Sequence, residues 1–285
     1  MITCNLMGGL GNQLFQIFTT ISYAIKTRNM FSFYNAEFTG GTGKTIKRNT
    51  YWENILSKLK PFLKTKFPIC NIIQESQFAF TEIPLTHFIN VNVCLHGYFQ
   101  SYKYFQNTYA TIYRLLNIDV HKDSIKNKNA SVGVDVDYNN TISIHFRLGD
   151  YKSLQHIHPI MPYEYYENAL TYIVENTKNT NVSRVVFFCE EEDLSDVTIT
   201  INKLKESFTQ FVFERASPEL QDWEQMLLMS CCKYNIIANS TFSWWGAYLN
   251  TDIDKIVCYP SLWFGPDAKH NTKDLFPNEW VKIQI

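Results

Sequence analysis

Three short segments of the chain combine residue types suited to a phosphorylated ligand. The first, residues 7–13, reads MGGLGNQ and stands between a strand-like run and a helical pattern. Glycines let the backbone approach a ligand, and the free N–H groups and dipole of a helix N-terminus favour negative charge. Strand, glycine turn and helix in this order predict an anion-binding loop, which includes Gly11, Asn12 and Gln13.

The second segment, residues 145–151, reads HFRLGDY and ends a β-branched run at residues 141–146. The planar guanidinium of Arg147 suits a phosphate and keeps its charge at any physiological pH. His145 can donate to a phosphate or to a base edge, and Asp150 can orient Arg147 or accept a proton. A structural ion pair that closes a turn is the alternative explanation of Arg147 and Asp150.

The third segment, residues 238–246, reads ANSTFSWWG and has the pattern of strand, polar turn and helix start. Asn239, Ser240, Thr241 and Ser243 are helix N-cap residue types. Several hydroxyl groups at one helix N-terminus predict a second phosphate cradle. Ordinary capping with a buried tryptophan pair explains the serines and tryptophans, but not the run of hydroxyls.

An acidic run, residues 189–193, follows another strand pattern at residues 184–189. A carboxylate such as that of Glu190 can accept hydrogen bonds from the N–H edge of guanine. Taken alone, a solvated acidic turn explains this run better.

The elements that must position these segments follow an α/β rhythm. β-Branched runs alternate with helical patterns in the second half, which predicts a mostly parallel sheet with helices on both faces. Ligands of such folds bind beyond the carboxyl ends of the strands. The predicted strands are residues 141–146, 184–189, 234–238 and 255–259, and the predicted helices include 162–174 and 243–249, with a further helical region after 217.

Two domains are expected from the composition along the chain. Residues 117–140 are rich in Lys, Asn and Asp, which predicts a linker. We therefore expect an N-terminal domain at residues 1–130 and a C-terminal domain at 131–285, the first a less regular α/β unit.

Bulk composition narrows the class of protein. Apolar content of 45% and charged content of 19% in 285 residues predict a folded globular chain. A net charge of −1 argues against a nucleic-acid partner. The early glycine loop leaves no room for a signal peptide, no apolar stretch approaches a membrane span of about 20 residues, and the seven cysteines form no CxxC pair. A cytoplasmic location is therefore expected.

The motifs, in this order, resemble those of the α-1,2-fucosyltransferases of glycosyltransferase family 11. The hallmarks of that family are a Gly-Gly-Leu-Gly-Asn-Gln opening, a His-x-Arg-Arg-Gly-Asp-Tyr motif and an Asn-Ser-Thr/Ser-Phe-Ser-Trp-Trp-Gly-Ala block. Weaker matches lie at residues 97–105, 165–169 and 260–280. The resemblance implies an α/β fold of the GT-B type, with two Rossmann-like domains facing across a cleft. The acceptor side would be residues 1–130, and residues 131–285 would bind GDP-fucose.

The resemblance also implies an activity and roles for residues. An inverting, metal-independent enzyme of this family moves L-fucose from GDP-β-L-fucose to a sugar hydroxyl, here expected to be the 2-OH of a terminal galactose, without a cofactor. Its partners would be the nucleotide-sugar donor and a glycan acceptor. Arg147 would hold the β-phosphate, with Asp150 as the nearest motif carboxylate. Donor contacts would come from Gly11, Asn12, Gln13, His145, Arg147, Glu190, Asn239, Ser240, Thr241, Phe242 and Ser243, and acceptor contacts from Gln100 and Trp245.

The chain departs from the family pattern at three places. Leu148 replaces a frequent second arginine, Tyr234 replaces a common histidine, and Glu190-Glu191 replaces a usual Asp-Asp pair. A single motif arginine is therefore left to serve the diphosphate.

Two other functions compete with this interpretation. A metal-dependent sugar transferase could use Asp135 and Asp137, the acidic pair that holds a divalent ion on a diphosphate. A non-catalytic glycan-binding protein could keep the fold and its aromatic surface, and would tolerate the loss of Arg147. A chelator separates the first alternative from a metal-independent enzyme.

Overall fold

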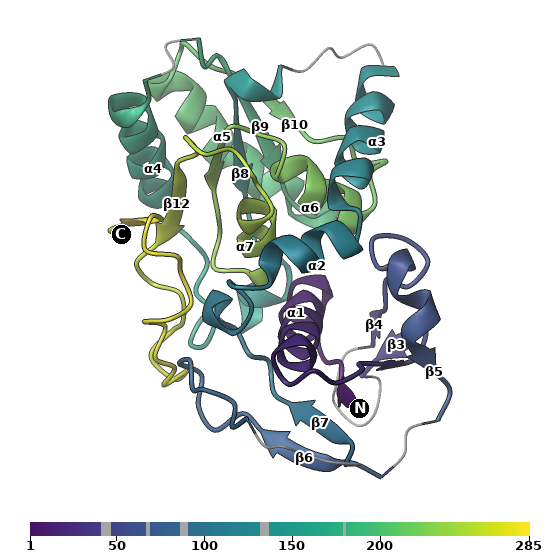
Figure 1. Cartoon of the computed structure of the whole chain (residues 1–285). Coiled ribbons are helices and arrows are strands. Elements are labelled where there is room, and N and C mark those ends of the chain that lie inside the picture. The colour runs from purple at the N-terminus through teal and green to yellow at the C-terminus, as the bar shows by residue number, and fades with distance from the viewer. Residues whose placement is uncertain (41–46, 67–68, 86–90, 132–136, 179–180) are drawn as a thin grey trace. The chain divides into compact units, whose positions relative to one another are not determined.

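The chain forms two compact units, each with its own parallel sheet (Figure 1). The computed structural model describes residues 1–40, 47–66, 69–85, 91–131, 137–178 and 181–285. Unit 1 comprises Met1–His121 and His270–Pro277, and unit 2 comprises Lys122–Lys269 and Asn278–Ile285. The predicted α/β class with parallel sheets is confirmed. The boundary expected at residue 130 falls inside helix α3 (Ile118–Ser131).

Unit 2 is built on a six-stranded, fully parallel sheet. The order is β10-β9-β8-β11-β12-β13. The chain runs outward from β8 through β9 to β10, and then returns to the other side of β8 with β11. The strand order therefore reverses between β8 and β11, and the crevice at such a reversal is where α/β folds bind ligands. The strands are β8 (Thr141–His145), β9 (Arg184–Phe188), β10 (Val212–Arg215), β11 (Tyr234–Ile236), β12 (Val257–Pro260) and β13 (Val281–Ile283).

Helices cover both faces of this sheet. Alternate residues of a strand face opposite sides. On one side of β8, Ile142 and Ile144 join a core with the helices α4 (Tyr163–Asn176) and α5 (Leu194–Ser207). On the other side lie α6 (Asp222–Met229) and α7 (Thr241–Tyr248), which pack on each other.

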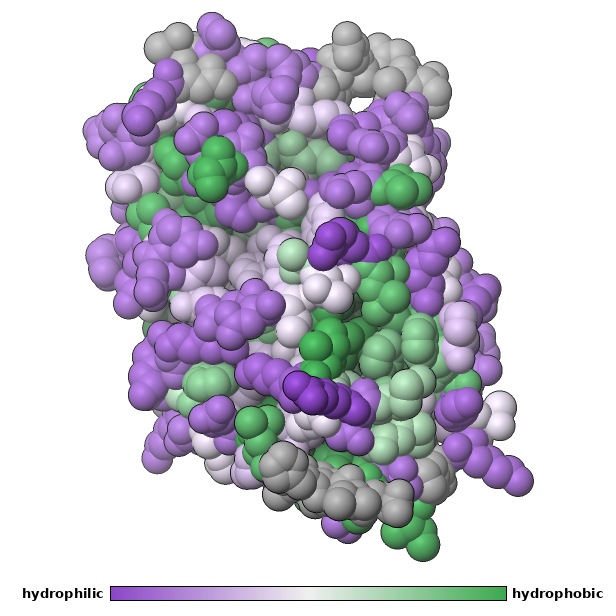
Figure 2. Space-filling model, in the orientation of Figure 1, coloured by the Kyte–Doolittle hydropathy of each residue, from purple (hydrophilic) through white to green (hydrophobic). Residues whose placement is uncertain are grey.

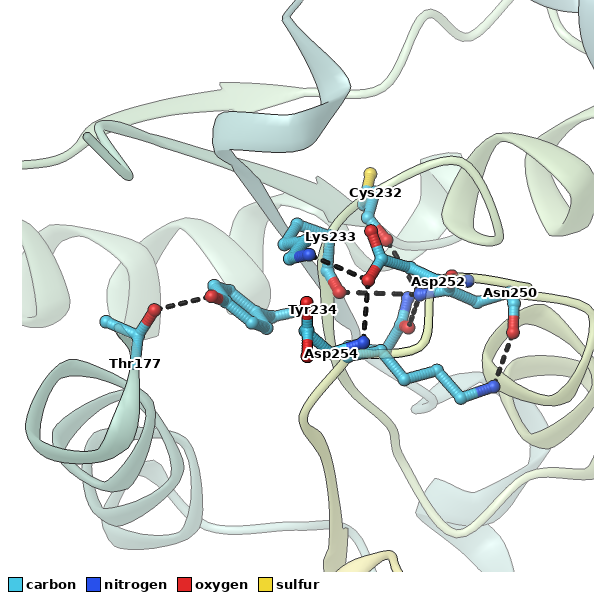
Figure 3. A network of polar contacts seen from close by, with 9 residues as sticks. Thr177, Cys232, Lys233, Tyr234, Asn250, Asp252 and Asp254 are labelled. Atoms are coloured by element: carbon cyan, nitrogen blue, oxygen red, sulfur yellow. Dashed lines mark hydrogen bonds and ion pairs between the residues drawn. The ribbon is translucent and has the colours of Figure 1, made fainter. Parts of the chain in front are cut away.

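Buried amides connect the central strands to the end of α7 (Figure 3). The Asn250 side chain donates to the carbonyl of Cys232 and to Oδ1 of Asn235, both at 2.9 Å, and accepts from Asp252 N at 2.9 Å. Asn235 donates in turn to Ser143 Oγ of β8 at 2.7 Å. Because each buried polar group has a partner, the network fixes β8, β11 and α7 relative to one another.

Two lysines hold the carboxyl end of α7. Lys122 Nζ donates to the carbonyl of Leu249 at 2.6 Å, and Lys255 Nζ donates to that of Ala247 at 3.3 Å. Cations stabilise the negative end of a helix dipole. Burial lowers the pKa of Lys255 to about 8. The anchored carboxyl end leaves the N-terminus of α7 at the carboxyl edge of the sheet.

Unit 1 is less regular. Its main sheet has the order β1-β7-β6 and is parallel, and two strand pairs accompany it, β2 with β5 and β3 with β4. Helix α1 (Leu10–Lys26) packs on β1, and Phe18 meets Phe105 at 5.4 Å between ring centroids. The remaining elements are β1 (Ile2–Cys4), β2 (Phe33–Tyr34), β3 (Phe38–Thr39), β4 (Arg48–Asn49), β5 (Leu63–Lys64), β6 (Asn71–Gln74), β7 (Val93–His96) and α2 (Tyr109–Leu115).

Helix α1 begins directly after the glycine turn, as the sequence predicts. Its apolar residues are buried, except for Ile25, which is 43% exposed. Its polar residues Thr19, Thr20 and Ser22 are also buried, so α1 is enclosed on nearly every side. Within the described part of the chain, no helix combines the length and apolarity needed to cross a bilayer.

The predicted linker at residues 117–140 is wrong over most of its length, because residues 118–131 form α3. Ile118 and Ile125, two turns apart, are both 1% exposed, and Lys122 between them is buried through its bond to Leu249. Two apolar positions and one hydrogen-bonded lysine anchor a helix that is otherwise exposed and has the composition of a loop. Helix α5 and strand β10 are further elements that the sequence did not predict.

We expect Asn250→Ala to destabilise unit 2. The change leaves a buried carbonyl and the Asn235 amide oxygen without their donor, which costs about 3 kcal/mol of unfolding free energy. Urea unfolding measures this loss. The exposed Asn176→Ala variant, which removes a bond within α4, should lose less than about 0.5 kcal/mol. Equal losses would contradict the role of the network.

Candidate functional site

The loops after β8, β9 and β11 meet at the carboxyl edge of the unit 2 sheet. Arg147 of the first loop pairs with Glu190 of the second. Tyr151 of the first loop donates to the carbonyl of Asn239 of the third at 3.2 Å. The three segments that the sequence singled out in this half therefore lie together.

Arg147 is the charged centre of this edge. Its guanidinium pairs with Asp150 on one nitrogen and with Glu190 on another, and its side chain is 18% exposed. Burial by itself would lower the pKa of Arg147, but the charges of Glu190 and Asp150 outweigh it and raise that pKa. The guanidinium is therefore a permanent positive charge held by carboxylates from two loops.

The loop around Arg147 depends on a close approach at Gly149. Its φ is +37°, and a Cβ there would lie 2.9 Å from Glu190 Oε2. Gly149 N donates at 2.7 Å to Oδ2 of Asp193, a carboxylate only 2% exposed whose other oxygen pairs with Lys152 at 2.8 Å. The buried Asp193 thus ties the Arg147 loop to the loop after β9.

Tyr151 supports Arg147 from the other side. Its ring lies 5.1 Å from Arg147 Cζ and stacks on His158 at 4.7 Å. Burial raises the pKa of Tyr151 to about 12, so its hydroxyl stays a donor. The sequence analysis did not select Tyr151 or Asp193. Their places, at the end of the arginine motif and at the end of the acidic run, are the signals that could have found them.

His145 ends β8 and is buried beside Arg147. Burial first, and then the charge of Arg147, lower its pKa to about 3, so the imidazole is neutral. Its ring lies 5.4 Å from that of Phe242 on the first turn of α7. Among the described residues its Nδ1 has no hydrogen-bond partner. Because buried polar atoms are nearly always bonded, this nitrogen points to a polar ligand atom.

Asn239 gives a second such atom on the neighbouring loop. Its amide donates to the carbonyls of Pro159 at 2.9 Å and Trp263 at 3.1 Å, and it is 2% exposed. Its Oδ1 has no partner in the described part of the chain. The amide nitrogen of Asn239 holds two loops together, and its carbonyl oxygen is able to accept a hydrogen bond from a ligand.

The remaining residues of the third segment differ in their positions. Ser240 caps α7 by accepting from Phe242 N at 3.3 Å, and Thr241 and Phe242 are half-buried. Ser243 is fully buried and donates back into its own turn. Trp245 has no exposed surface, so in this structure it is a core residue and does not present a face to an acceptor.

In unit 1, buried amides shape the glycine turn. Gly8 has a φ of +76°, and Gln13 donates to its carbonyl at 3.0 Å and to that of Asn49 at 2.8 Å. Gln16 exchanges two hydrogen bonds of 2.9 Å with the backbone of Met7. Gln13 is completely buried, and it holds the turn. Gly11 is also buried, and Asn12 is half-buried.

Gln100 lies beside this turn. Its amide donates to Asn12 Oδ1 at 3.0 Å, which joins residues far apart in sequence. The Glu75 carboxylate accepts from the backbone N–H groups of Tyr98 and Phe99 at 2.7 and 2.9 Å. The loop that carries Gln100 is therefore fixed by a carboxylate.

The structure also describes Leu148, a departure from the family pattern, and Asp137, one of the two residues of the metal-dependent alternative. Leu148, at the position of the frequent second arginine of the motif it resembles, packs against the apolar core of unit 2. Asp135 lies outside the described residues. Asp137 accepts from the backbone of Asn139 at 3.1 Å and from the Asn140 amide at 2.5 Å, and so caps a short turn.

Comparison with known proteins decides the family. The model of "Glycosyl transferase family 11" matches residues 1–284. The chain belongs to this family. The glycosyltransferase family that the three motifs predicted is thus confirmed.

Three proteins to which the chain is similar are named as sugar transferases. The chain is 39% identical to the O-antigen biosynthesis glycosyltransferase WbnK of Escherichia coli over 147 residues. The aligned part is 50% of this chain and 45% of that protein. An alpha-1,2-colitosyltransferase of Escherichia coli is 27% identical over 100% of the chain and 99% of its own length. A galactoside 2-alpha-L-fucosyltransferase of Caenorhabditis elegans is 22% identical over 99% and 79%. A solved mutant of Arabidopsis thaliana FUT1 in complex with GDP has a TM-score of 0.49 and 10% identity over 90% of this chain and 69% of its own.

His145 makes stability depend on pH. The pKa of His145 is about 3 in the native state and about 6.5 in the unfolded chain. Between these pH values His145 is protonated in the unfolded chain and neutral in the native state. The contribution of neutral His145 to the free energy of unfolding is fully present above pH 6.5. It falls by about 1.4 kcal/mol per pH unit as the pH drops toward 3. Urea unfolding of the wild type and His145→Asn at pH 7 and pH 5 should show a smaller acid loss in the variant. Identical losses would contradict a neutral, buried His145.

Proposed function

We propose that the chain is an inverting, metal-independent fucosyltransferase that moves L-fucose from GDP-β-L-fucose to the 2-OH of a terminal galactose. The observation that carries this proposal is the fixed charge of Arg147 at the strand reversal of unit 2, next to the unpartnered polar atoms of His145 and Asn239. Membership of family 11 and the names of the full-length relatives support the same reaction class.

The role of Arg147 is to stabilise the leaving group. As the bond from fucose to the diphosphate breaks, negative charge develops on the β-phosphate. A preorganised cation at that place lowers the barrier, because its charge need not reorganise during the reaction. In other transferases a divalent ion supplies this charge, so an arginine held in the same position accounts for metal independence.

Donor binding would exchange one partner of Arg147. Glu190 is 52% exposed and Asp150 is 37% exposed, so Glu190 is the easier carboxylate to displace. A diphosphate that takes the place of Glu190 leaves Asp150 to keep the guanidinium oriented. The released Glu190 carboxylate is then able to accept the N–H edge of guanine, and neutral His145 is able to bond the phosphate or the base.

Attack by the acceptor hydroxyl comes from the face opposite the leaving GDP, through an oxocarbenium-like transition state. When the leaving group departs well before attack, the hydroxyl needs little basic assistance, and its proton passes to water as the new bond forms. We therefore assign no general base, and Asp150 serves as a positioning residue for Arg147. Gln100 is the proposed contact of the acceptor, and Asn12, which accepts a hydrogen bond from it in unit 1, is a proposed contact of the donor.

A colitosyl donor is the second candidate. The relative aligned over essentially the whole of both chains is named as an alpha-1,2-colitosyltransferase. Fucose and colitose, each activated on GDP, are therefore compared in the same assay, where the higher kcat/KM identifies the donor.

We expect GDP release from GDP-fucose in the presence of a chelator, and only when a terminal β-galactoside such as lactose is added.

Arg147→Ala should lower kcat roughly a hundredfold or more, because it removes the positive charge that stabilises the leaving group. Arg114→Ala, an exposed arginine of unit 1, is the matched control and should keep wild-type turnover. Full turnover by a folded Arg147→Ala protein would overturn the mechanism. Release that requires a divalent ion would favour the metal-dependent alternative.

Glu190→Gln should distinguish binding of the guanine base from binding of the diphosphate. We expect the KM for GDP-fucose to rise about tenfold, because a charge-assisted bond to guanine is lost. Inhibition by inorganic diphosphate, which has no base, should stay equal or become stronger, since Arg147 loses a competing carboxylate. The neighbouring exposed Glu192→Gln is the control. Parallel weakening of both ligands would contradict the guanine contact.

A further inference from the structure

The glycine at position 149 leaves the loop of Arg147 without a fixed backbone conformation of its own. Glycine adopts left-handed and right-handed conformations at similar cost, so a chain that passes through it is free to take several directions. The φ of Gly149 is +37°, and Arg147 lies only two residues before it. A contact from outside the loop is needed to select the conformation that places the guanidinium.

Asp193 makes such a contact. Its Oδ2 accepts from Gly149 N at 2.7 Å, and its Oδ1 pairs with Lys152 Nζ at 2.8 Å. Gly149 and Lys152 belong to the same short 3₁₀ turn, Gly149–Ser153, which directly follows Arg147 and Leu148. One carboxylate from the loop after β9 therefore holds the Arg147 loop at two points.

The burial of this carboxylate is unusual. Hydrophilic residues predominate on the molecular face that Figure 2 shows, whereas Asp193 is 2% exposed and is the most buried acidic residue in the described part of the chain. Asp193 is also the N-cap residue of α5, where an aspartate ordinarily accepts from a backbone N–H of its own helix. Within the described helix it makes no such bond. Its hydrogen-bonding capacity is directed to the Arg147 loop instead.

The three carboxylates near Arg147 differ in what they hold. Asp150 belongs to the same loop, so it orients the guanidinium relative to the loop but does not fix the loop to the sheet. Glu190 comes from the loop after β9, but it is 52% exposed and is the partner that a diphosphate replaces in the proposed function. Once Glu190 has left, the Asp193 carboxylate still connects these two loops.

We propose that Asp193 is a positioning residue of sugar transfer, which keeps Arg147 in place while the donor occupies the site. This rests on the proposed function, in which Arg147 stabilises the leaving diphosphate. A displacement of about 1 Å at a catalytic group costs up to about a hundredfold in rate. The bond from Gly149 to Asp193 therefore contributes to kcat without any contact between Asp193 and the donor.

Asp193→Ala tests this role, with Asp196→Ala as the matched control. Asp196 has the same charge and pairs with the same Lys152 at 2.8 Å, but Gly149 N donates to Asp193 and not to Asp196. We expect Asp193→Ala to lower kcat with GDP-fucose roughly tenfold or more, because the guanidinium loses its fixed place. Asp196→Ala should keep kcat within about twofold. Equal losses in the two variants would overturn the proposal.

The Arg147→Ala background separates positioning from general support of the fold. If Asp193 acts through Arg147, Asp193→Ala should lower kcat no further once Arg147 has been replaced. The same fold-loss in both backgrounds would assign Asp193 a purely structural role and overturn the proposal. Urea unfolding of the four proteins shows that each is folded under the assay conditions.

Binding of GDP tests the same coupling without sugar transfer. Calorimetry should give a Kd for GDP about tenfold higher in Asp193→Ala than in Asp196→Ala, and equal values when Arg147 is also replaced. This coupling in a protein that does not transfer fucose would overturn the proposed function alone. Its absence in an active enzyme would overturn the positioning role alone, and a wild type that does not bind GDP would overturn both.

Amide hydrogen exchange of the wild type gives a test that does not depend on the stability of Asp193→Ala. The N–H of Gly149 should exchange slowly in the free protein, because it donates to a buried carboxylate. It should remain equally protected at saturating GDP. Loss of this protection on GDP binding would mean that the bond breaks together with that of Glu190, which would overturn the proposal.

Discussion

The guanidinium of Arg147 is largely withdrawn from water and must be balanced where it lies. A desolvated charge is tolerated only when opposite charges and hydrogen bonds surround it. Asp150 and Glu190 supply the charges, and Tyr151 supplies a ring at 5.1 Å. Position 149 is suited to glycine chiefly because its φ is +37°, and a Cβ there would also lie 2.9 Å from Glu190 Oε2.

The strand order of the unit 2 sheet places the Arg147 loop where a ligand is able to bind. Strand order reverses between β8 and β11, so the loops that carry Arg147 and Asn239 leave from neighbouring strands at the same edge. Below them, Ser143, Asn235 and Asn250 bond one strand to the next and to the end of α7. A rigid base of this kind keeps a long side chain in one place without help from the ligand.

Sequence analysis predicted the loops of unit 2 because parallel α/β folds place strand ends together: His145 lies at the end of a clear strand pattern, and Arg147 and Asn239 each follow one. It failed where polarity was misleading. Residues 118–131 were predicted as part of a linker because only Ile118 and Ile125 form the apolar face. Lys122 is buried because it donates to the carbonyl of Leu249, a partner that the sequence pattern cannot predict. Trp245 read as a contact residue, since spacing does not show which face of a short helix is enclosed.

The unpartnered atoms of the site bear on its energetics. His145 Nδ1 and Asn239 Oδ1 are buried and unbonded among the described residues, and such a group costs about 1–3 kcal/mol. The native state keeps them because the same side chains do other work: Asn239 holds two loops through its amide nitrogen. A ligand that bonds both atoms removes that cost only in the folded protein, so its binding stabilises the fold as well. Asn239 Oδ1 is an acceptor only, so the ligand atom that satisfies it must be a donor such as a hydroxyl or N–H group, whereas His145 Nδ1 is able to donate to a phosphate oxygen when it carries the ring proton.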